Sequence, residues 1–267
     1  MDNFLYAENA KKAKRIIIKI GSAILTHPTG KINIKRIENL TKAAADLSNS
    51  GREIILVTSG AVSVGAAKLG MRLPLEKIED KKAAAAVGQA ELMSIYDRFF
   101  MSFGIKIAQI LLTRDIIENS ERRSQAEETL KALLDMSCVP IVNENDTVSS
   151  DEIKFSGNDI LSAYVAKLCE AELLINLSDV DGLYNKNPAE HSDAELVREV
   201  REVTPEILAF AGGAGSSRGT GGMITKLKAA LLVREQGIPM IIANGADPDI
   251  LYDILDGRIF GTYIKNN

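Results

Sequence analysis

Short apolar runs rich in Ile, Val and Leu recur along the chain. They occupy residues 15–20 (RIIIKI), 53–58, 105–112, 139–143, 172–177 and 239–243. The runs are nearly continuous rather than alternating, which is typical of strands buried on both faces of a parallel sheet. Helical patterns separate them, over residues 33–50, 61–69, 79–103, 121–135, 159–169 and 222–235. The alternation predicts an α/β fold, namely a three-layer αβα sandwich with a mainly parallel central sheet.

The loops that follow these runs are rich in Gly, Ser, Thr, Asn and Asp. They read KIGSA, TSGAVSVG, NENDTVSSDEIKFSGND and SDVDGLYNKNP. Ordinary turns use the same residues, so one such loop would carry little information. In open α/β sheets, however, ligands bind beyond the carboxyl ends of the strands. Several polar loops at strand ends therefore predict a binding site along that edge.

The stretch GSSRGTGGMITKLKAA, residues 215–230, is a candidate anion site. Glycines at 219, 221 and 222 would let backbone N–H groups approach an anion at the start of a helix. Lys226, about one turn into that helix, could reach back over its start. The alternative is a flexible loop before a surface helix with solvated lysines. The P-loop, the dinucleotide-binding turn and the protein-kinase motifs are all absent from the sequence.

Lys19 favours the anion site. A lysine inside RIIIKIGS is costly to bury without a partner, yet it stands near the end of a central strand. A charge in that position indicates function. Lys19 and Lys226 would then approach one ligand from two sides, as a migrating negative charge requires.

The stretch from Asn143 to Asp159 is unusually dense in polar and acidic residues. Asp159, or Asn158 before it, is expected to cap the following helix, which explains one of them. A divalent-cation cage is an alternative for the rest, although their order does not match the EF-hand loop.

Composition limits the function classes. The 267 residues carry a net charge of −4 and contain no Trp, which argues against a nucleic-acid groove. A few local cations can still serve small anions. The two cysteines, Cys138 and Cys169, have no metal-ligand spacing, and we expect both to be buried. His27 and His191 are expected at the surface, and Gly88 beside an alanine run predicts close helix packing.

A cytoplasmic location is expected. Basic residues follow the short apolar patch at the N-terminus rather than precede it, unlike a secretory signal. No stretch approaches the roughly 20 apolar residues that span a bilayer, so we expect no contact with membranes.

Six segments together resemble the amino acid kinase family. They are VTSGAVSVGAAKLG, AAAAVGQAELM, QILLTRD, TLKALLDMSCVPIVNENDTVSSDEIKFSGNDILSA, DVDGLY and GTGGMITKLKAA, in order over nearly the whole chain. NEND, EIKFSGND and GTGGMxTK are similar to the branch of the family that phosphorylates L-glutamate. The resemblance implies ATP-dependent phosphorylation of the glutamate side-chain carboxylate, the first step of proline synthesis, with Mg²⁺ as cofactor.

The resemblance also implies residue roles. Lys19 and Lys226 would hold the migrating phosphoryl group, and Asp159 would orient the two lysines. Ser59, Asp146 and Asn158 would bind glutamate. The nucleotide pocket would be lined by Lys19, Gly21, Ser178, Asp179, Thr220, Gly221, Gly222, Met223, Ile224, Thr225 and Lys226. No protein ligands for the metal are assigned.

The resemblance further implies one kinase domain over residues 1–267. About 1–180 would form the amino-acid-binding half and about 181–267 the nucleotide-binding half, without the C-terminal RNA-modification-type domain of longer members. A homo-oligomer, dimer or tetramer, is expected, with residues 83–103 as a contact, and proline is a candidate feedback inhibitor. The alternatives are a family member acting on N-acetylglutamate, aspartate, carbamate or a nucleoside monophosphate, or a non-catalytic amino-acid or nucleotide sensor.

Overall fold

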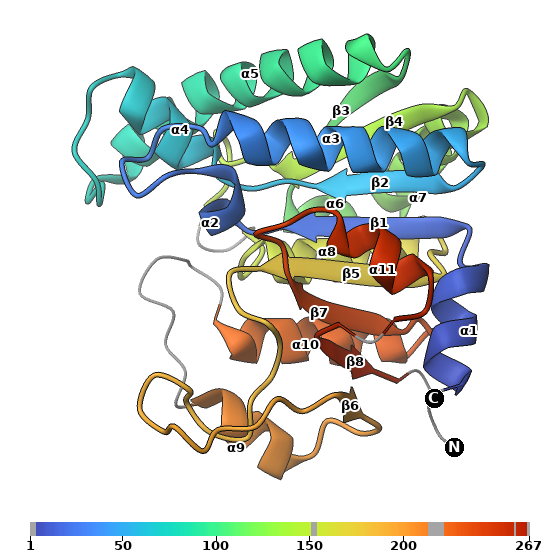
Figure 1. Cartoon of the computed structure of the whole chain (residues 1–267). Coiled ribbons are helices and arrows are strands. Elements are labelled where there is room, and N and C mark those ends of the chain that lie inside the picture. The colour runs from blue at the N-terminus through green and yellow to red at the C-terminus, as the bar shows by residue number, and fades with distance from the viewer. Residues whose placement is uncertain (1–3, 151–153, 213–221, 259, 266–267) are drawn as a thin grey trace.

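The computed structural model of the chain describes residues 4–150, 154–212, 222–258 and 260–265 (Figure 1). Within them, one sheet of eight strands runs through the molecule in the order β3-β4-β2-β1-β5-β7-β8-β6. The strands are β1 Arg15–Ile20, β2 Glu53–Val57, β3 Lys106–Leu112, β4 Cys138–Glu144, β5 Leu173–Ser178, β6 Glu199–Val200, β7 Met240–Asn244 and β8 Thr262–Ile264. All neighbouring strands pair in parallel except β7 and β8, which are antiparallel.

Helices cover both faces of the sheet, so the expected αβα sandwich is confirmed. One layer contains α1 Phe4–Lys12, α2 Ser22–Leu25, α3 Ile34–Asn49, α4 Ala61–Lys68, α5 Ile78–Ser102 and α11 Ile250–Leu255. The other contains α6 Arg114–Glu118, α7 Ser120–Asp135, α8 Asn158–Leu168, α9 Pro205–Gly212 and α10 Met223–Arg234. In Figure 1, α3 and α11 lie in front of the sheet, and α7 and α8 lie behind it.

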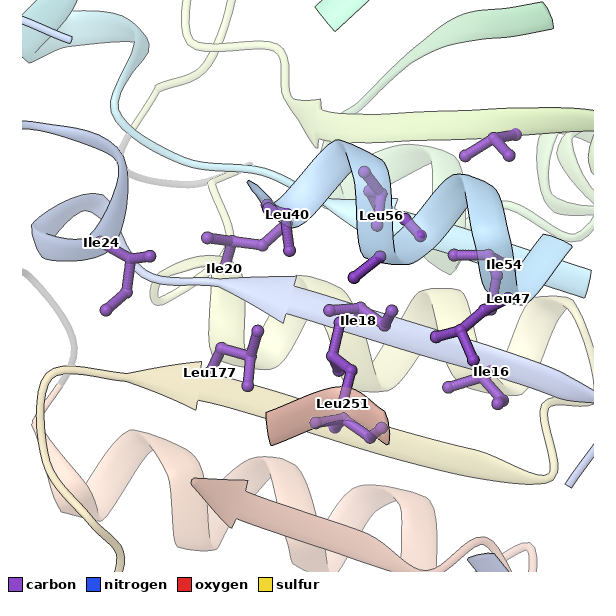
Figure 2. Close-up of a cluster of buried hydrophobic side chains, with 14 of the residues drawn as sticks. Ile16, Ile18, Ile20, Ile24, Leu40, Leu47, Ile54, Leu56, Leu177 and Leu251 are labelled. Carbon is purple, nitrogen blue, oxygen red and sulfur yellow. The ribbon is translucent and has the colours of Figure 1, made fainter. Parts of the chain in front are cut away.

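The central strand β1 shows how the two faces are filled. Ile16, Ile18 and Ile20 are fully buried against Leu40 and other side chains of α3 and α11 (Figure 2). Ile17 belongs to the cluster on the opposite face. Because alternate side chains point to opposite faces, an unbroken apolar run serves both layers. Burying each such side chain fully contributes about 1.5–3 kcal/mol.

All six predicted strands and all six predicted helices are present, with ends that agree to within one residue. The sequence did not predict α1, α2, α6, α9, α11, β6 or β8. One strand differs in burial from the expectation: β3 is mostly half-exposed, because it forms an edge of the sheet. Cys169 is buried as expected, whereas Cys138, at the start of β4, is only half-buried.

Helices α4 and α5 are in direct backbone contact. A Cβ on Gly88 would lie 1.8 Å from the carbonyl oxygen of Ala61, and a Cβ on Gly65 would lie 1.7 Å from that of Ala84. Only glycine permits this approach. The contact fixes the start of α4 and with it the end of the loop that carries Ser59.

None of the helices in the described ranges combines the length and the apolar character needed to cross a membrane.

Candidate active site

Lys19 lies near the carboxyl end of β1 and points toward α8. Its neighbours Ile18 and Ile20 face the layer of α3, whereas Lys19 and Ile17 face the other layer. The lysine is 6% exposed. Its Nζ lies 2.6 Å from Asp159 Oδ1, and this ion pair offsets the cost of burying the ammonium group.

Lys226 reaches the same carboxylate from the first turn of α10. Its Nζ lies 3.3 Å from Asp159 Oδ2, and the residue is 5% exposed. The helix begins at Met223 after the N-cap residue Gly222. The structure therefore brings Lys19 and Lys226 together, although they come from opposite ends of the chain.

Asp159 accepts four donors, two on each carboxylate oxygen. Oδ1 binds Lys19 and the side-chain amide of Asn176, whose Nδ2 is 2.8 Å away. Oδ2 binds Lys226 and the hydroxyl of Thr225, whose Oγ1 is 2.6 Å away. Each oxygen thus pairs with one ammonium group and one neutral donor.

The prediction that Asp159 or Asn158 caps the following helix is wrong. Helix α8 begins at Asn158, and its N-cap is Gly157, which provides no side-chain cap and has a φ of 104°. Glycine adopts that backbone conformation readily, while other residues do not. Since Gly157 occupies the cap position, the side chains of Asn158 and Asp159 are available for contacts with other elements.

Asp159 and Lys19 perturb each other electrostatically. Burial would raise the pKa of Asp159, but the nearby ammonium groups of Lys19 and Lys226 outweigh it, and the pKa lies below its usual range. Burial lowers the pKa of Lys19; Asp159 opposes this shift, and repulsion from Lys226 adds to it. Two lysines around one carboxylate leave an excess of positive charge, which suits a bound polyanion.

Asn158 lies beside Ser59 at the end of β2. Its Nδ2 is within hydrogen-bond distance of the Thr58 carbonyl oxygen at 2.5 Å, Ser59 Oγ at 3.0 Å and Asn143 Oδ1 at 2.9 Å. A carbonyl oxygen can only accept, so these contacts fix the orientation of the Asn158 amide. Oδ1 is the atom of Asn158 that is left for a ligand.

Asp146 lines the same cavity as Ser59 and Asn158. Burial, aided by the neighbouring charge of Glu144, raises the pKa of Asp146 to about 6. Glu144 is itself held by the Ser149 hydroxyl at 2.8 Å and the Phe155 amide at 2.9 Å. The surroundings of Asp146 disfavour its ionised form, and a cationic ligand would stabilise that form.

Three of the residues predicted to bind the nucleotide line the cavity at strand ends: Gly21 follows β1, Ser178 is the last residue of β5, and Asp179 follows it. Met223 and Thr225 line it from α10, but the Thr225 hydroxyl is bonded to Asp159. Apart from Lys19 and Lys226, the other residues predicted to contact the nucleotide are not part of the described cavity lining. Ile224 lies outside the cavity lining and is 40% exposed, Gly222 precedes α10, and Thr220 and Gly221 lie outside the described residues.

The cavity has a volume of about 1490 Å³. Ligand pockets for a single small molecule are typically ~300–1,000 Å³, so this one has room for two substrates. Lys19, Lys226 and Asp159 line it together with Ser59, Asp146, Asn158, Gly21, Ser178 and Asp179. Tyr184, Pro188 and Phe210 add apolar walls that the sequence did not single out.

Asn176 is the site residue that sequence reasoning missed most clearly. It stands in the apolar run of β5, pairs in register with Lys19 of β1 and is fully buried. The sequence did contain a signal for Asn176. It is a polar residue inside a buried strand, which is the same feature that singled out Lys19. The Thr225 hydroxyl was assigned to the nucleotide, and its contact with Asp159 could not be foreseen.

The carboxylates that the structure describes form no protein cage for a metal ion. No group of three or more His, Cys, Asp or Glu side chains in the described part of the chain is arranged to hold an ion. Both oxygens of Asp159 are taken by protein donors. Asp179 is a further carboxylate in the cavity lining. This donor set fits a Mg²⁺ ion carried mainly by phosphates, since Mg²⁺ commonly uses one or two carboxylates and substrate oxygens.

Comparison with known proteins agrees with this chemistry. A model of the amino acid kinase family matches residues 14–244. A glutamate 5-kinase of Clostridium perfringens is 48% identical over 94% of this chain and 95% of the relative. A protein of the same name from Listeria monocytogenes is 46% identical over 96% of this chain and 94% of the relative. Another from Enterococcus faecalis is 47% identical over 96% of each.

Solved structures share the fold. An isopentenyl phosphate kinase superposes with a TM-score of 0.65 at 21% identity, covering 94% of this chain and all of the other. A UMP kinase from Bacillus anthracis gives 0.65 at 17% identity, covering 96% and 97%.

Proposed function

The chain belongs to the amino acid kinase family, and from this premise we propose that it transfers the γ-phosphoryl group of ATP to the side-chain carboxylate of L-glutamate. The product is L-glutamyl 5-phosphate, the first intermediate of proline synthesis. The observation that carries the proposal is the pair of ammonium groups on opposite oxygens of Asp159, at the wall of a cavity large enough for both substrates.

The reaction needs no general base. A glutamate side chain in water has a pKa of about 4.3, so its carboxylate is already a nucleophile at neutral pH. One carboxylate oxygen forms a bond to the γ-phosphorus while the bond from that phosphorus to the bridging oxygen breaks. The bonding electrons leave with ADP, and no proton is transferred. The obstacle is charge, because an anion must approach a polyanion.

Lys19 and Lys226 meet that obstacle. The transition state spreads negative charge over the equatorial phosphoryl oxygens. Two buried ammonium groups fixed by one carboxylate can donate to those oxygens from two sides without reorganising. Asp159 is therefore a positioning residue: it sets the distance between the two ammonium groups and offsets the cost of burying them.

Asp146 and Asn158 bind the glutamate ammonium group in this proposal. The Asp146 carboxylate gains a cationic partner, and Asn158 contributes Oδ1, since its Nδ2 is held by protein acceptors. Ser59 completes this end of the site. An N-acylated substrate would leave the Asp146 carboxylate unpaired, which selects for a free amino acid.

Residues on the other side of the lysines bind ATP in this proposal. Gly21, Ser178 and Asp179 lie closest to the strand ends, and α10 directs its N-terminal N–H groups toward the cavity. Mg²⁺ would arrive with the nucleotide, be held by its phosphates and by Asp179, and compensate phosphate charge. In this proposal the nucleotide site crosses the expected division at about residue 180, because Gly21, Ser178 and Asp179 precede it and α10 follows it.

Assembly and regulation are proposed on the resemblance alone. A homo-oligomer would use residues 83–103, most of helix α5, where Met101 is exposed. Proline, the product of the pathway, is the proposed feedback inhibitor.

Trapping the acyl phosphate with hydroxylamine tests the function. We expect ATP-dependent hydroxamate with L-glutamate and at least about a hundredfold less with N-acetylglutamate or L-aspartate. Comparable activity on N-acetylglutamate would overturn the role of Asp146. ADP formation with UMP or carbamate but not with glutamate would favour another member of the family, and no turnover with any acceptor would favour a sensor.

A further inference from the structure

Gln89 of helix α5 contacts Asn143, a residue that lines the main cavity. It is 8% exposed, and its Oε1 accepts a hydrogen bond from Asn143 Nδ2 at 2.9 Å. Its Nε2 is buried and has no hydrogen-bond partner. A buried amide nitrogen without a partner carries a desolvation cost that needs an explanation.

The amide orientations form a directed chain. The Thr58 carbonyl oxygen fixes Asn158 Nδ2, which then meets Asn143 Oδ1. Asn143 must therefore present Nδ2 to its other side, where Gln89 Oε1 accepts it. Gln89 is left with Nε2 pointing away from Asn143. Reversing any one of the three amides would set two donors or two acceptors against each other.

Gln89, the last of the three hydrogen-bonded amides, lines a small cavity. It has a volume of about 10 Å³ and is lined by Gln89 together with Ala61, Ala85, Leu111, Glu144, Asn145, Asp146 and Thr147. That volume matches the roughly 10–15 Å³ needed for one water molecule. Its walls offer several polar groups besides Gln89, and a buried water needs about two to four.

We propose that Gln89 is a positioning residue for the amino-acid substrate, and that its Nε2 donates to a single buried water shared with residues 144–147, the end of β4 and the turn that follows it. Through Asn143, Gln89 holds the Asn158 amide with Oδ1 toward the substrate. Through the water, it supports the turn that carries Asp146. One side chain outside the main cavity thus aligns both groups that bind the ammonium. This role rests on the function proposed above.

Gln89→Met removes the acceptor and the donor while nearly keeping the shape. We expect the KM for L-glutamate to rise about tenfold, with the kcat and the KM for ATP within about twofold of the unmodified protein. Preference for L-glutamate over glutarate, which lacks the ammonium group, should fall by a similar factor. Leu92→Met, a buried apolar change on the same helix, should leave all four values unchanged.

A glutamate KM and a glutarate preference within about twofold of the unmodified protein would overturn the proposal. Equal increases in the KM for L-glutamate and the KM for ATP would also overturn it, because they would indicate general damage to the site. If Gln89→Met does not fold, a crystal structure of the unmodified protein decides: a water bonded to Gln89 Nε2 is expected, and an empty cavity would overturn the proposal. If the unmodified protein does not phosphorylate glutamate, the proposed function fails, and the water site is still tested by that structure.

Discussion

Lys19 and Lys226 contact opposite oxygens of one carboxylate, at 2.6 Å and 3.3 Å from Asp159. The three residues come from β1, α8 and α10. A single side chain therefore sets the spacing of both cations, and the chemistry depends on that spacing.

Asp159→Asn should impair catalysis and folding together. The change removes the charge that offsets burial of two ammonium groups, and uncompensated buried charges cost about 3–5 kcal/mol. We expect the kcat to fall at least about a hundredfold and the free energy of unfolding to drop by several kcal/mol. Steady-state kinetics and denaturant unfolding measure both. Normal turnover in a folded variant would remove Asp159 from the mechanism.

Asn176→Leu should separate catalysis from stability. Asn176 donates to Asp159 Oδ1, but its own Oδ1 is buried without a partner, and the rest of β5 is buried. The change removes the unpaired Asn176 Oδ1, and Asp159 Oδ1 keeps its ion pair with Lys19, so we expect only a small net cost for folding. We expect the kcat to fall about tenfold, because Asp159 loses a neutral donor that fixes its orientation. The melting temperature should stay within a few degrees; an unchanged kcat would contradict the role given to Asn176.

The raised pKa of Asp146 predicts a pH effect on glutamate binding. The ammonium group binds the ionised carboxylate, so kcat/KM for glutamate should be level above about pH 6 and fall as Asp146 is protonated below it. In Asp146→Asn, kcat/KM should be low at every pH and lack this step. The ratio of the two profiles cancels the titration of ATP and glutamate. A ratio that does not change with pH would argue against Asp146 as the ammonium partner.

The close packing of α4 and α5 makes Gly88 sensitive to a single methyl group. Gly88→Ala would place a Cβ 1.8 Å from the Ala61 carbonyl oxygen, which the backbone cannot accommodate without moving. We expect a loss of about 1–3 kcal/mol or more in the free energy of unfolding. Ala86→Ser, on the exposed side of the same helix, should change it by less than about 0.5 kcal/mol. Equal stability of the two variants would contradict the backbone contact.

The long elements were predictable because each carries a sustained apolar pattern. The missed ones are short or unusually placed. Strand β6 has two residues, and β8 has three and runs antiparallel to β7. Thr262 of β8 is fully buried, and its hydroxyl accepts a hydrogen bond from the Leu183 amide and donates one to the Val197 carbonyl oxygen. No local sequence pattern reveals these two partners.

The site was predictable to the extent that its residues violate local rules. Lys19 in a buried strand and glycines before Lys226 both indicated an anion site. The same rule applied to Asn176 was overlooked. The pairing of individual atoms around Asp159 could not be predicted, because its four donors come from β1, β5 and α10 and meet only in the folded chain.

The most direct test of the account compares Lys226→Ala with Lys228→Ala in ATP-dependent hydroxamate formation from L-glutamate. Both lysines lie on α10, but Lys226 is buried at the cavity and Lys228 is exposed. Loss of one preorganised charge contact should lower the kcat of Lys226→Ala at least about a hundredfold, while Lys228→Ala stays within about twofold of the unmodified protein. Near-normal turnover by Lys226→Ala, or equal losses in both variants, would contradict transfer between two converging cations.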